Sequence, residues 1–236
     1  MKNTEYNTHK LKTGVKAFDD MLGGGLNIPS LNMICARPGM GKTSFALQLI
    51  QNIAKESGKI VCFFTLDNTT AQIKSKLALP NDTSDLNIII DDTPLISVAD
   101  MLQKIADREN LGLVVIDYLQ LICSDNKMHC RKEEMENICR ELKDLSRNLS
   151  LPVVVTSQAC KIAEYRENHR PLISDLDYTG DVEKYFDTIA FLYRENYYDQ
   201  NADDSAEIIV AKNGYGDTGT INMKWDDYSL KFLEKN

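Results

Sequence analysis

The sequence predicts an α/β protein with a mainly parallel, helix-covered sheet and an antiparallel extension toward its C-terminal end. Two observations lead to this fold class. From about residue 31 to residue 158, short apolar runs alternate with segments of helical periodicity, and the connections between them are short. After residue 187, four strand-like segments follow one another without helices between them. Because no repeat and no second domain is visible, residues 13–236 are expected to form a single domain.

The N-terminal part is expected to contribute little regular structure. Residues 1–12 are polar and aperiodic, which indicates a tail or the end of a linker. Thr13 is expected to cap a short helix with apolar residues at positions 15, 18 and 22, and the glycines at 23–25 would end that helix.

The middle of the chain carries the elements of the parallel sheet. Strands are predicted near residues 31–35, 59–66, 87–90, 113–117 and 153–155, and their apolar runs are typical of strands buried on both faces. Helices are predicted after the first strand to about residue 57, over 69–79, from a capping box at Ser97 and Asp100 to about 108, and around 135–149. Residues 80–85 are expected to form a short segment that breaks the regular structure.

Four strand-like segments close the pattern, at residues 188–193, 207–212, 219–224 and 229–233. Turn residues separate them, among them Asn213-Gly214 and Gly216-Asp217. This arrangement predicts that all four extend the sheet in antiparallel order.

Composition narrows the class of protein. With 43% hydrophobic and 26% charged residues, the 236-residue chain is typical of a globular domain with a sizeable core. No apolar run approaches a membrane span and the polar start is unlike a signal peptide, so we expect a cytoplasmic protein without a membrane partner. None of the six cysteines forms a C-x-x-C pair, which favours reduced thiols over disulfides or zinc. The net charge of −8 excludes nucleic-acid binding through bulk charge alone, so any such contact must rest on a local patch.

The run from Ala36 to Thr43 is a phosphate-binding loop in which alanine replaces the first glycine. It follows an apolar strand and opens a helix, which is the setting in which such loops bind nucleoside triphosphates. Two glycines let backbone N–H groups turn toward a phosphate, Lys42 would neutralise the β- and γ-phosphates, and Thr43 would hold Mg²⁺. The predicted nucleotide-binding residues here are Ala36, Arg37, Pro38, Gly39, Met40, Gly41, Lys42, Thr43 and Ser44.

Polar residues at the ends of three predicted strands complete this site. Asp117 ends an apolar strand, and beside a phosphate loop a role in holding Mg²⁺ is favoured over that of a turn aspartate. Asp67 ends the strand after the loop's helix, a position from which a carboxylate can orient an attacking water. Gln158 ends a third strand, where sensing of the γ-phosphate and an ordinary turn glutamine are about equally good interpretations.

A set of short segments gives the sequence a specific resemblance. The run Asp117-Tyr118-Leu119-Gln120-Leu121-Ile122 follows an apolar strand, and it is accompanied by the segments 36–43, 152–158, 170–176, 191–194, 211–212 and 218–220. Together they closely resemble the DnaB family of replicative DNA helicases, from about Thr13 to the C-terminus and without the family's N-terminal helical domain. The resemblance implies a RecA-like ATPase core that works as a hexameric ring, with ATP and Mg²⁺ between subunits, single-stranded DNA in the central channel and replication proteins as partners.

The resemblance also implies roles for residues that the pattern alone does not distinguish. It implies that Tyr193 and Arg194 contact the base of the nucleotide. On the DNA side of the ring it implies Lys161, Arg166, Arg170 and Gly180, in and after a loop that faces the channel. Without the resemblance, these cations are ordinary solvated surface charges.

Four departures from the family's pattern accompany the match. Asp67 stands where the family usually has glutamate, and a misplacement of about 1 Å can cost roughly a hundredfold in rate. Gly214 stands where the family has its arginine finger, whose loss can remove on the order of a thousandfold, and Lys212 would be a partial substitute. Asp177 replaces an arginine of the DNA-binding loop, and the segment 78–86 is shorter than the family norm.

These observations leave a leading hypothesis and two alternatives. The leading hypothesis is an ATP-hydrolysing motor domain of the replicative-helicase type. Its catalytic residues are Lys42, Asp67, Asp117, Gln158 and Lys212, and its metal ligands are Thr43 and Asp117. The departures favour, as a second hypothesis, a degenerate relative that binds nucleotide and regulates a true helicase with little or no hydrolysis. A recombinase- or clock-like ATPase, suggested by residues 22–26, is disfavoured by the run at 117–121.

Overall fold

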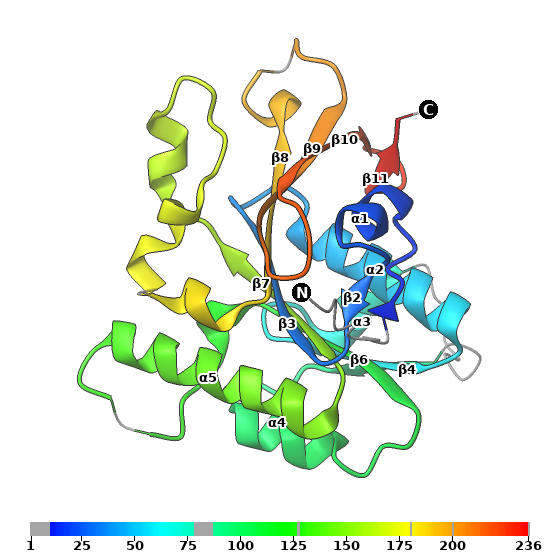
Figure 1. The fold of residues 1–236 in the computed structure, drawn as a ribbon, viewed down its shortest axis with the longest axis vertical. Coiled ribbons are helices and arrows are strands. Elements are labelled where there is room, and N and C mark those ends of the chain that lie inside the picture. The colour runs from blue at the N-terminus through cyan, green and yellow to red at the C-terminus, as the bar shows by residue number, and fades with distance from the viewer. Residues whose placement is uncertain (1–9, 78–86, 127, 180, 200, 236) are drawn as a thin grey trace, which may run out of the picture.

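A computed structural model describes residues 10–77, 87–126, 128–179, 181–199 and 201–235 (Figure 1). The predicted breaker segment 80–85, the end of the helix predicted over 69–79, and the short segment 78–86 lie outside these residues. Among the described helices, none combines the length and the apolar character that crossing a bilayer requires.

One sheet dominates the described residues, with the strand order β11-β10-β9-β8-β3-β7-β6-β4-β5. Its parallel part consists of β3 (Ser30–Ala36), β4 (Ile60–Thr65), β5 (Ile88–Asp91), β6 (Leu111–Asp117), β7 (Pro152–Gln158) and β8 (Thr188–Arg194). The antiparallel part consists of β9 (Ser205–Asn213), β10 (Gly219–Asp226) and β11 (Lys231–Glu234). The predicted fold class, a mainly parallel sheet with an antiparallel extension, is confirmed.

The prediction for the strand near 188–193 was wrong in its direction. We expected this segment to begin the antiparallel extension, but β8 runs parallel to β3, with Met33 opposite Ile189. Its other side pairs with β9 in antiparallel order. The alternation of residues along a strand is the same in both kinds of pairing, so the pattern could not distinguish them.

Helices cover both faces of the sheet (Figure 1). They are α1 (Lys16–Met21), α2 (Lys42–Ser57), α3 (Thr70–Lys76), α4 (Val98–Ile105) and α5 (Arg131–Leu149). Side chains of α1, α2 and α3 belong to one buried apolar cluster, and side chains of α4 and α5 belong to a second. The central strand β3 contributes to both, because Ile34 packs in the first cluster while Met33 and Cys35 pack in the second.

Short 3₁₀ helices occupy several connections. They are η1 (Leu119–Leu121), η2 (Lys161–Tyr165), η3 (Ile173–Thr179), η4 (Val182–Tyr185) and η5 (Glu195–Tyr197). Three of them, η2 to η4, lie between β7 and β8, in the stretch that the sequence predicted as the DNA-side loop and its continuation.

The N-terminal expectations need two corrections. Lys10 and Leu11 form β1 (Lys10–Leu11) and pair with β2 (Leu26–Asn27), so these two residues belong to the fold and not to a tail. Thr13 does not cap α1, which begins at Lys16 with Val15 at the cap position. Asp19, inside the helix, accepts the N–H of Thr13 at 2.8 Å and thereby fixes the turn before the helix. By contrast, the capping box of Ser97 and Asp100 is confirmed at the start of α4.

The strand ends bring the predicted polar residues to one edge of the sheet. Ala36 at the end of β3 is in register with Gln158 at the end of β7. Thr65 at the end of β4 is in register with Asp117 at the end of β6. The carboxyl ends of parallel strands are where α/β sheets bind ligands, and the phosphate loop follows β3, near the middle of this sheet.

Candidate nucleotide-binding site

The phosphate loop spans the gap between the end of β3 and the first residue of α2. Gly39 and Gly41 have φ values of 79° and 97°, in the left-handed region that favours glycine. Steric contacts also require glycine at both positions. A Cβ on Gly39 would lie 2.7 Å from the Tyr197 ring, and one on Gly41 would lie 3.0 Å from the Trp225 ring. The loop can therefore turn its backbone N–H groups toward an anion only with glycine at these two positions.

Lys42 lies at the start of α2 with its ammonium inside the loop. Its Nζ donates to the carbonyl oxygens of Ala36 and Arg37, both at 3.2 Å. Burial lowers the pKa of the Lys42 ammonium, and the carboxylates of Asp117 and Asp67 oppose this shift. The loop thus holds one nearly buried cation, the group that the phosphates of a nucleotide need.

Asp117 and two threonines form a buried cluster next to the loop. Thr43 Oγ1 donates to Asp117 Oδ2 at 2.7 Å, and Thr156 Oγ1 donates to Asp117 Oδ1. Asp117 is only 1% exposed, so these two hydrogen bonds fix its carboxylate. A hydroxyl and a carboxylate are hard oxygen ligands, and this pair therefore fits Mg²⁺ bound together with phosphate oxygens.

Asp67 and Gln158 lie at the same edge. Asp67 follows β4 in an exposed bend, and the preceding N–H of Leu66 donates to the Asp117 carbonyl at 2.8 Å. Burial and the charge of Asp67 raise the pKa of the Tyr118 hydroxyl. The Gln120 amide holds the backbone at Gln158, accepting from its N–H and donating to its carbonyl oxygen, both at 3.3 Å.

A cleft of about 330 Å³ lies against the loop. Gly39, Gly41, Lys42, Thr43 and Ser44 line one side of it. The other side is formed by Arg194, Trp225, Asp227 and Leu230. The phosphate loop and the antiparallel part of the sheet therefore share one concave surface.

Trp225 is a residue of this cleft that the sequence did not reveal. The Arg194 guanidinium lies 4.0 Å from the centre of its ring, within the range of a cation–π contact. Its Nε1 donates to Asp227 Oδ1 at 2.5 Å. Trp225 is the single tryptophan of the chain and lies in a strand of ordinary alternation, so only its rarity could have drawn attention to it.

Aromatic rings of Trp225 and Phe232 pack next to Gly41 of the phosphate loop. Phe232 lies edge-to-face with Phe45 at 5.4 Å and with Trp225 at 5.1 Å between ring centres. The Gln48 side chain pairs with the backbone of Phe232, donating to its oxygen at 2.8 Å and accepting its N–H at 3.0 Å. These contacts hold β11 against the first turns of α2, next to the phosphate loop.

The remaining predicted residues of the loop contribute to its conformation and not to the polar surface of the cleft. Ala36 is the last residue of β3, and its carbonyl also accepts the N–H of Ala159. The Arg37 side chain donates to Glu164 at 2.9 Å and to the Ala159 carbonyl at 2.8 Å, which ties the loop to η2. Pro38 is exposed and Met40 is buried, so neither side chain adds a polar group to the cleft.

A comparison with known protein families agrees with this fold and this site. A family profile described as the DnaB-like helicase C-terminal domain matches residues 10–82 and 76–234. The chain belongs to this family. Among the described residues, the loop, Thr43 and Asp117 lie in the parts of the chain that the family profile matches.

Relatives of the DnaB-like domain agree with this assignment. The replicative DNA helicase DnaB of Geobacillus stearothermophilus and the replicative DNA helicase DnaC of Bacillus subtilis (strain 168) are each 33% identical to it, over 94% of the chain. The chain spans only 56% of the length of either relative.

Solved structures confirm the RecA-like fold. A solved structure described as an ATPase domain matches with a TM-score of 0.89 and 26% identity, over 99% of this chain and 94% of that one. A DnaB-like replicative helicase, described with its interactions with primase, matches equally well over 99% of this chain and 64% of that one. The RadB recombinase matches at a TM-score of 0.68 and 16% identity, which shows a common fold only.

Tyr193 and Arg194 have different surroundings in the DnaB-like domain. Arg194 lines the cleft, whereas Tyr193 is 2% exposed and does not line it. The Arg170 guanidinium lies 4.6 Å from the centre of the Tyr193 ring, and Tyr198 stacks beside it at 6.1 Å. Burial raises the pKa of Tyr193 to about 12.

Two of the predicted DNA-side cations are engaged within the chain. Arg166 forms two hydrogen bonds of 2.7 and 2.6 Å with Asp175, whose side chain is 0% exposed. Arg170 forms a similar pair with Glu207, at 2.9 and 2.6 Å. Lys161 is exposed at the start of η2. Gly180 and the side chain of Asp177 lie outside the described residues.

Lys212 lies far from the phosphate loop of its own chain. In β9 it is paired with Ile189, near the start of β8, whereas Arg194 at the end of β8 lines the nucleotide cleft. Its Nζ donates to the Glu183 carbonyl at 2.6 Å, and burial lowers the pKa of its ammonium. The structure therefore separates Lys212 from the other four predicted catalytic residues.

Proposed function

We propose that this chain is the ATP-binding and ATP-hydrolysing motor domain of a replicative DNA helicase and that it acts on single-stranded DNA during replication. One observation carries the proposal. Lys42, Thr43 and Asp117 meet at the carboxyl edge of the sheet, in a chain that belongs to the DnaB-like family. These are the groups that bind a nucleoside triphosphate with its metal ion in loops of this type.

The site residues divide the work between charge and position. Lys42 binds the β- and γ-phosphates, replacing its bonds to the loop carbonyls with bonds to phosphate oxygens. Thr43 and Asp117 would hold Mg²⁺, and the ion would supply positive charge that neutralises the phosphates. Arg194 and Trp225 flank the base in the cleft, and the RecA-like domain comprises residues 13–236 together with β1.

Hydrolysis requires a positioned water as well as a bound nucleotide. Asp67 is exposed beside Asp117 and orients that water. Its side chain is one methylene shorter than the glutamate that the family usually has at this position. Gln158, at the end of β7, contacts the γ-phosphate. This contact couples the bound nucleotide to the β7–β8 connection. The Arg37–Glu164 ion pair joins the phosphate loop to the same connection.

We further propose that the chain works as a hexameric ring. The position of Lys212, at the far edge of the sheet from its own phosphate loop, supports a role at the nucleotide of a neighbouring subunit. Lys161 and Gly180 would contact the DNA backbone, while Arg166 and Arg170 shape the loop. This function belongs to the cytoplasm, with other replication proteins as partners.

The test measures ATP hydrolysis with and without single-stranded DNA, and the mass of the assembly alongside. We expect turnover that DNA stimulates, in an oligomer, and loss of ATP binding in Lys42→Ala. Absence of turnover under all these conditions, with ATP still bound, would sink the motor function and favour a nucleotide-binding regulator.

A further inference from the structure

The nucleotide cleft has two ends of opposite charge. At one end the ammonium of Lys42 lies inside the phosphate loop, and at the other end the carboxylate of Asp227 lines the cleft. A carboxylate repels a triphosphate, so the phosphates of a bound nucleotide belong at the Lys42 end. The end that Asp227 lines is therefore left for the base of the nucleotide.

The indole of Trp225 separates Asp227 from the phosphate loop. Its six-membered ring faces the loop, because a Cβ on Gly41 would lie 3.0 Å from Cζ3 of that ring. Its five-membered ring carries the N–H that donates to Asp227 Oδ1 at 2.5 Å. The Arg194 guanidinium lies 4.0 Å from the centre of the same indole and 3.8 Å from Asp227 Oδ1. These contacts hold one oxygen of the Asp227 carboxylate in place at the far end of the indole.

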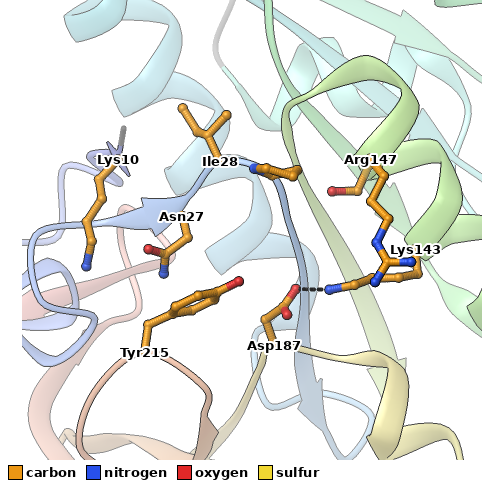
Figure 2. A pocket seen from close by; sticks show the side chains of 9 residues that line it. Lys10, Asn27, Ile28, Lys143, Arg147, Asp187 and Tyr215 are labelled. Atoms are coloured by element: carbon orange, nitrogen blue, oxygen red, sulfur yellow. Dashed lines mark hydrogen bonds and ion pairs between the residues drawn. The ribbon is translucent and has the colours of Figure 1, made fainter. Parts of the chain in front are cut away.

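The second oxygen of the Asp227 carboxylate is open to a ligand. Asp227 Oδ2 accepts no hydrogen bond from the described residues, and the side chain is 77% exposed. Asp187, in the cavity at the amino edge of the sheet, provides a contrast (Figure 2). Its Oδ2 accepts the Leu31 N–H at 2.7 Å and pairs with Lys143, so that oxygen is satisfied within the chain. Asp227 instead offers an acceptor to whatever occupies the nucleotide cleft.

A turn held by hydrogen bonds carries Asp227 into the cleft. This turn joins β10 to β11, and Asp226 fixes it by accepting the Tyr228 N–H at 3.2 Å and the Ser229 hydroxyl at 2.5 Å. Leu230 ends the turn with a φ of 54°, which is uncommon for a bulky residue, and it lines the cleft although it is half exposed. The turn therefore places an apolar surface near the carboxylate, and a flat base can pack against such a surface.

The chemistry of a carboxylate determines which base it favours. An ionised carboxylate only accepts hydrogen bonds, so it favours a base edge that donates them. Adenine carries an amino group at C6, and a single acceptor oxygen is enough to bind it. The two neighbouring donors of guanine match both oxygens of a carboxylate, but Trp225 already occupies Oδ1 of Asp227. Adenine is therefore the base that fits the one open oxygen.

We propose that Asp227 selects adenine nucleotides, with its Oδ2 accepting a hydrogen bond from the amino group at C6 of the base. The inference rests on the proposed function, since it concerns the base of the nucleotide that the phosphate loop binds. Asp227 determines specificity and takes no part in hydrolysis. Its carboxylate is exposed and regains water when the amino group is missing, so the preference is about 10-fold, at the lower end for a hydrogen bond to a charged group.

The test compares ATP with purine riboside triphosphate, which carries hydrogen in place of the amino group at C6. Calorimetry measures both affinities in the wild-type chain and in Asp227→Ala. We expect the wild type to prefer ATP about 10-fold and the variant to lose that preference. Asp204→Ala is the matched control and should keep the wild-type preference, because Asp204 pairs with Lys224 at 2.8 Å outside the cleft.

Inorganic tripolyphosphate, which has no base, separates recognition of the base from support of the phosphate loop. Its affinity should be the same in the wild type and in Asp227→Ala. An equal loss of tripolyphosphate and ATP affinity in the variant would overturn the proposal, because Asp227 would then support the loop. Equal binding of ATP and purine riboside triphosphate by the wild type, or a preference that survives in Asp227→Ala, would overturn it as well. A wild-type chain that binds none of the three ligands would instead refute the proposed function, on which the inference rests.

Discussion

The ion pair between Arg166 and Asp175 predicts that the Arg166 side chain stabilises the fold. Both carboxylate oxygens of Asp175 accept from the Arg166 guanidinium, and the carboxylate is fully buried. In Arg166→Ala the N–H of Leu172, at 2.7 Å, would still donate to that carboxylate, but both guanidinium hydrogen bonds would be lost. We therefore expect this substitution to destabilise the protein.

The magnitude follows from the burial of the two partners. Removing one member of a buried ion pair costs about 3–5 kcal/mol. The Leu172 N–H still compensates one oxygen and Arg166 itself is 26% exposed, so we expect the lower end, about 3 kcal/mol. For a chain of this length that loss lowers the thermal midpoint by roughly 6–12 °C.

The assay is urea unfolding, with binding of single-stranded DNA measured on the same samples. Lys161→Ala is the control, since an exposed lysine should change stability by no more than about 0.5 kcal/mol. If Arg166→Ala unfolds at the wild-type midpoint while its DNA affinity falls, the ion-pair argument is wrong and Arg166 is a phosphate contact.

Three further predictions concern the nucleotide site. Asp67→Glu should raise ATP turnover, by up to about a hundredfold, because it lengthens the group that orients water; flat turnover with intact ATP binding would contradict that role. ATP should change the fluorescence of Trp225, the single tryptophan, in the wild-type chain but not in Lys42→Ala, and a response in that variant would argue against the cleft as the binding site. Burial lowers the pKa of the Lys42 ammonium, so ATP affinity should fall as pH rises through that lowered pKa, because the uncharged amine no longer attracts the phosphates. Lys42→Arg should abolish that decline, since arginine stays protonated, and an equal decline in both proteins would refute the assignment.

Local patterns predicted the parts of the fold that depend on neighbours in sequence. The phosphate loop, the strands at 113–117 and 153–155 and the capping box at Ser97 depend on spacing within a few residues. The meeting of Thr43 with Asp117 was predictable as well, because parallel strands align their carboxyl ends.

The features that sequence reasoning missed depend on contacts between distant residues. The pattern of charges did not reveal that Arg166 pairs with Asp175 and Arg170 with Glu207, because the fold brings these partners together. The same holds for Trp225, which reaches the cleft because β10 pairs with β9 and not because of any motif.

The clasp between Gln48 and Phe232 has a consequence for synthesis of the protein. Its two partners are 184 positions apart, and Phe232 also packs against Phe45 at the start of the loop's helix. Translation proceeds from the N-terminus, so the phosphate loop leaves the ribosome long before the strand that braces it. The contacts of Phe232 with Gln48 and Phe45 can therefore form only late in the synthesis of this domain, after the phosphate loop and its helix have already left the ribosome.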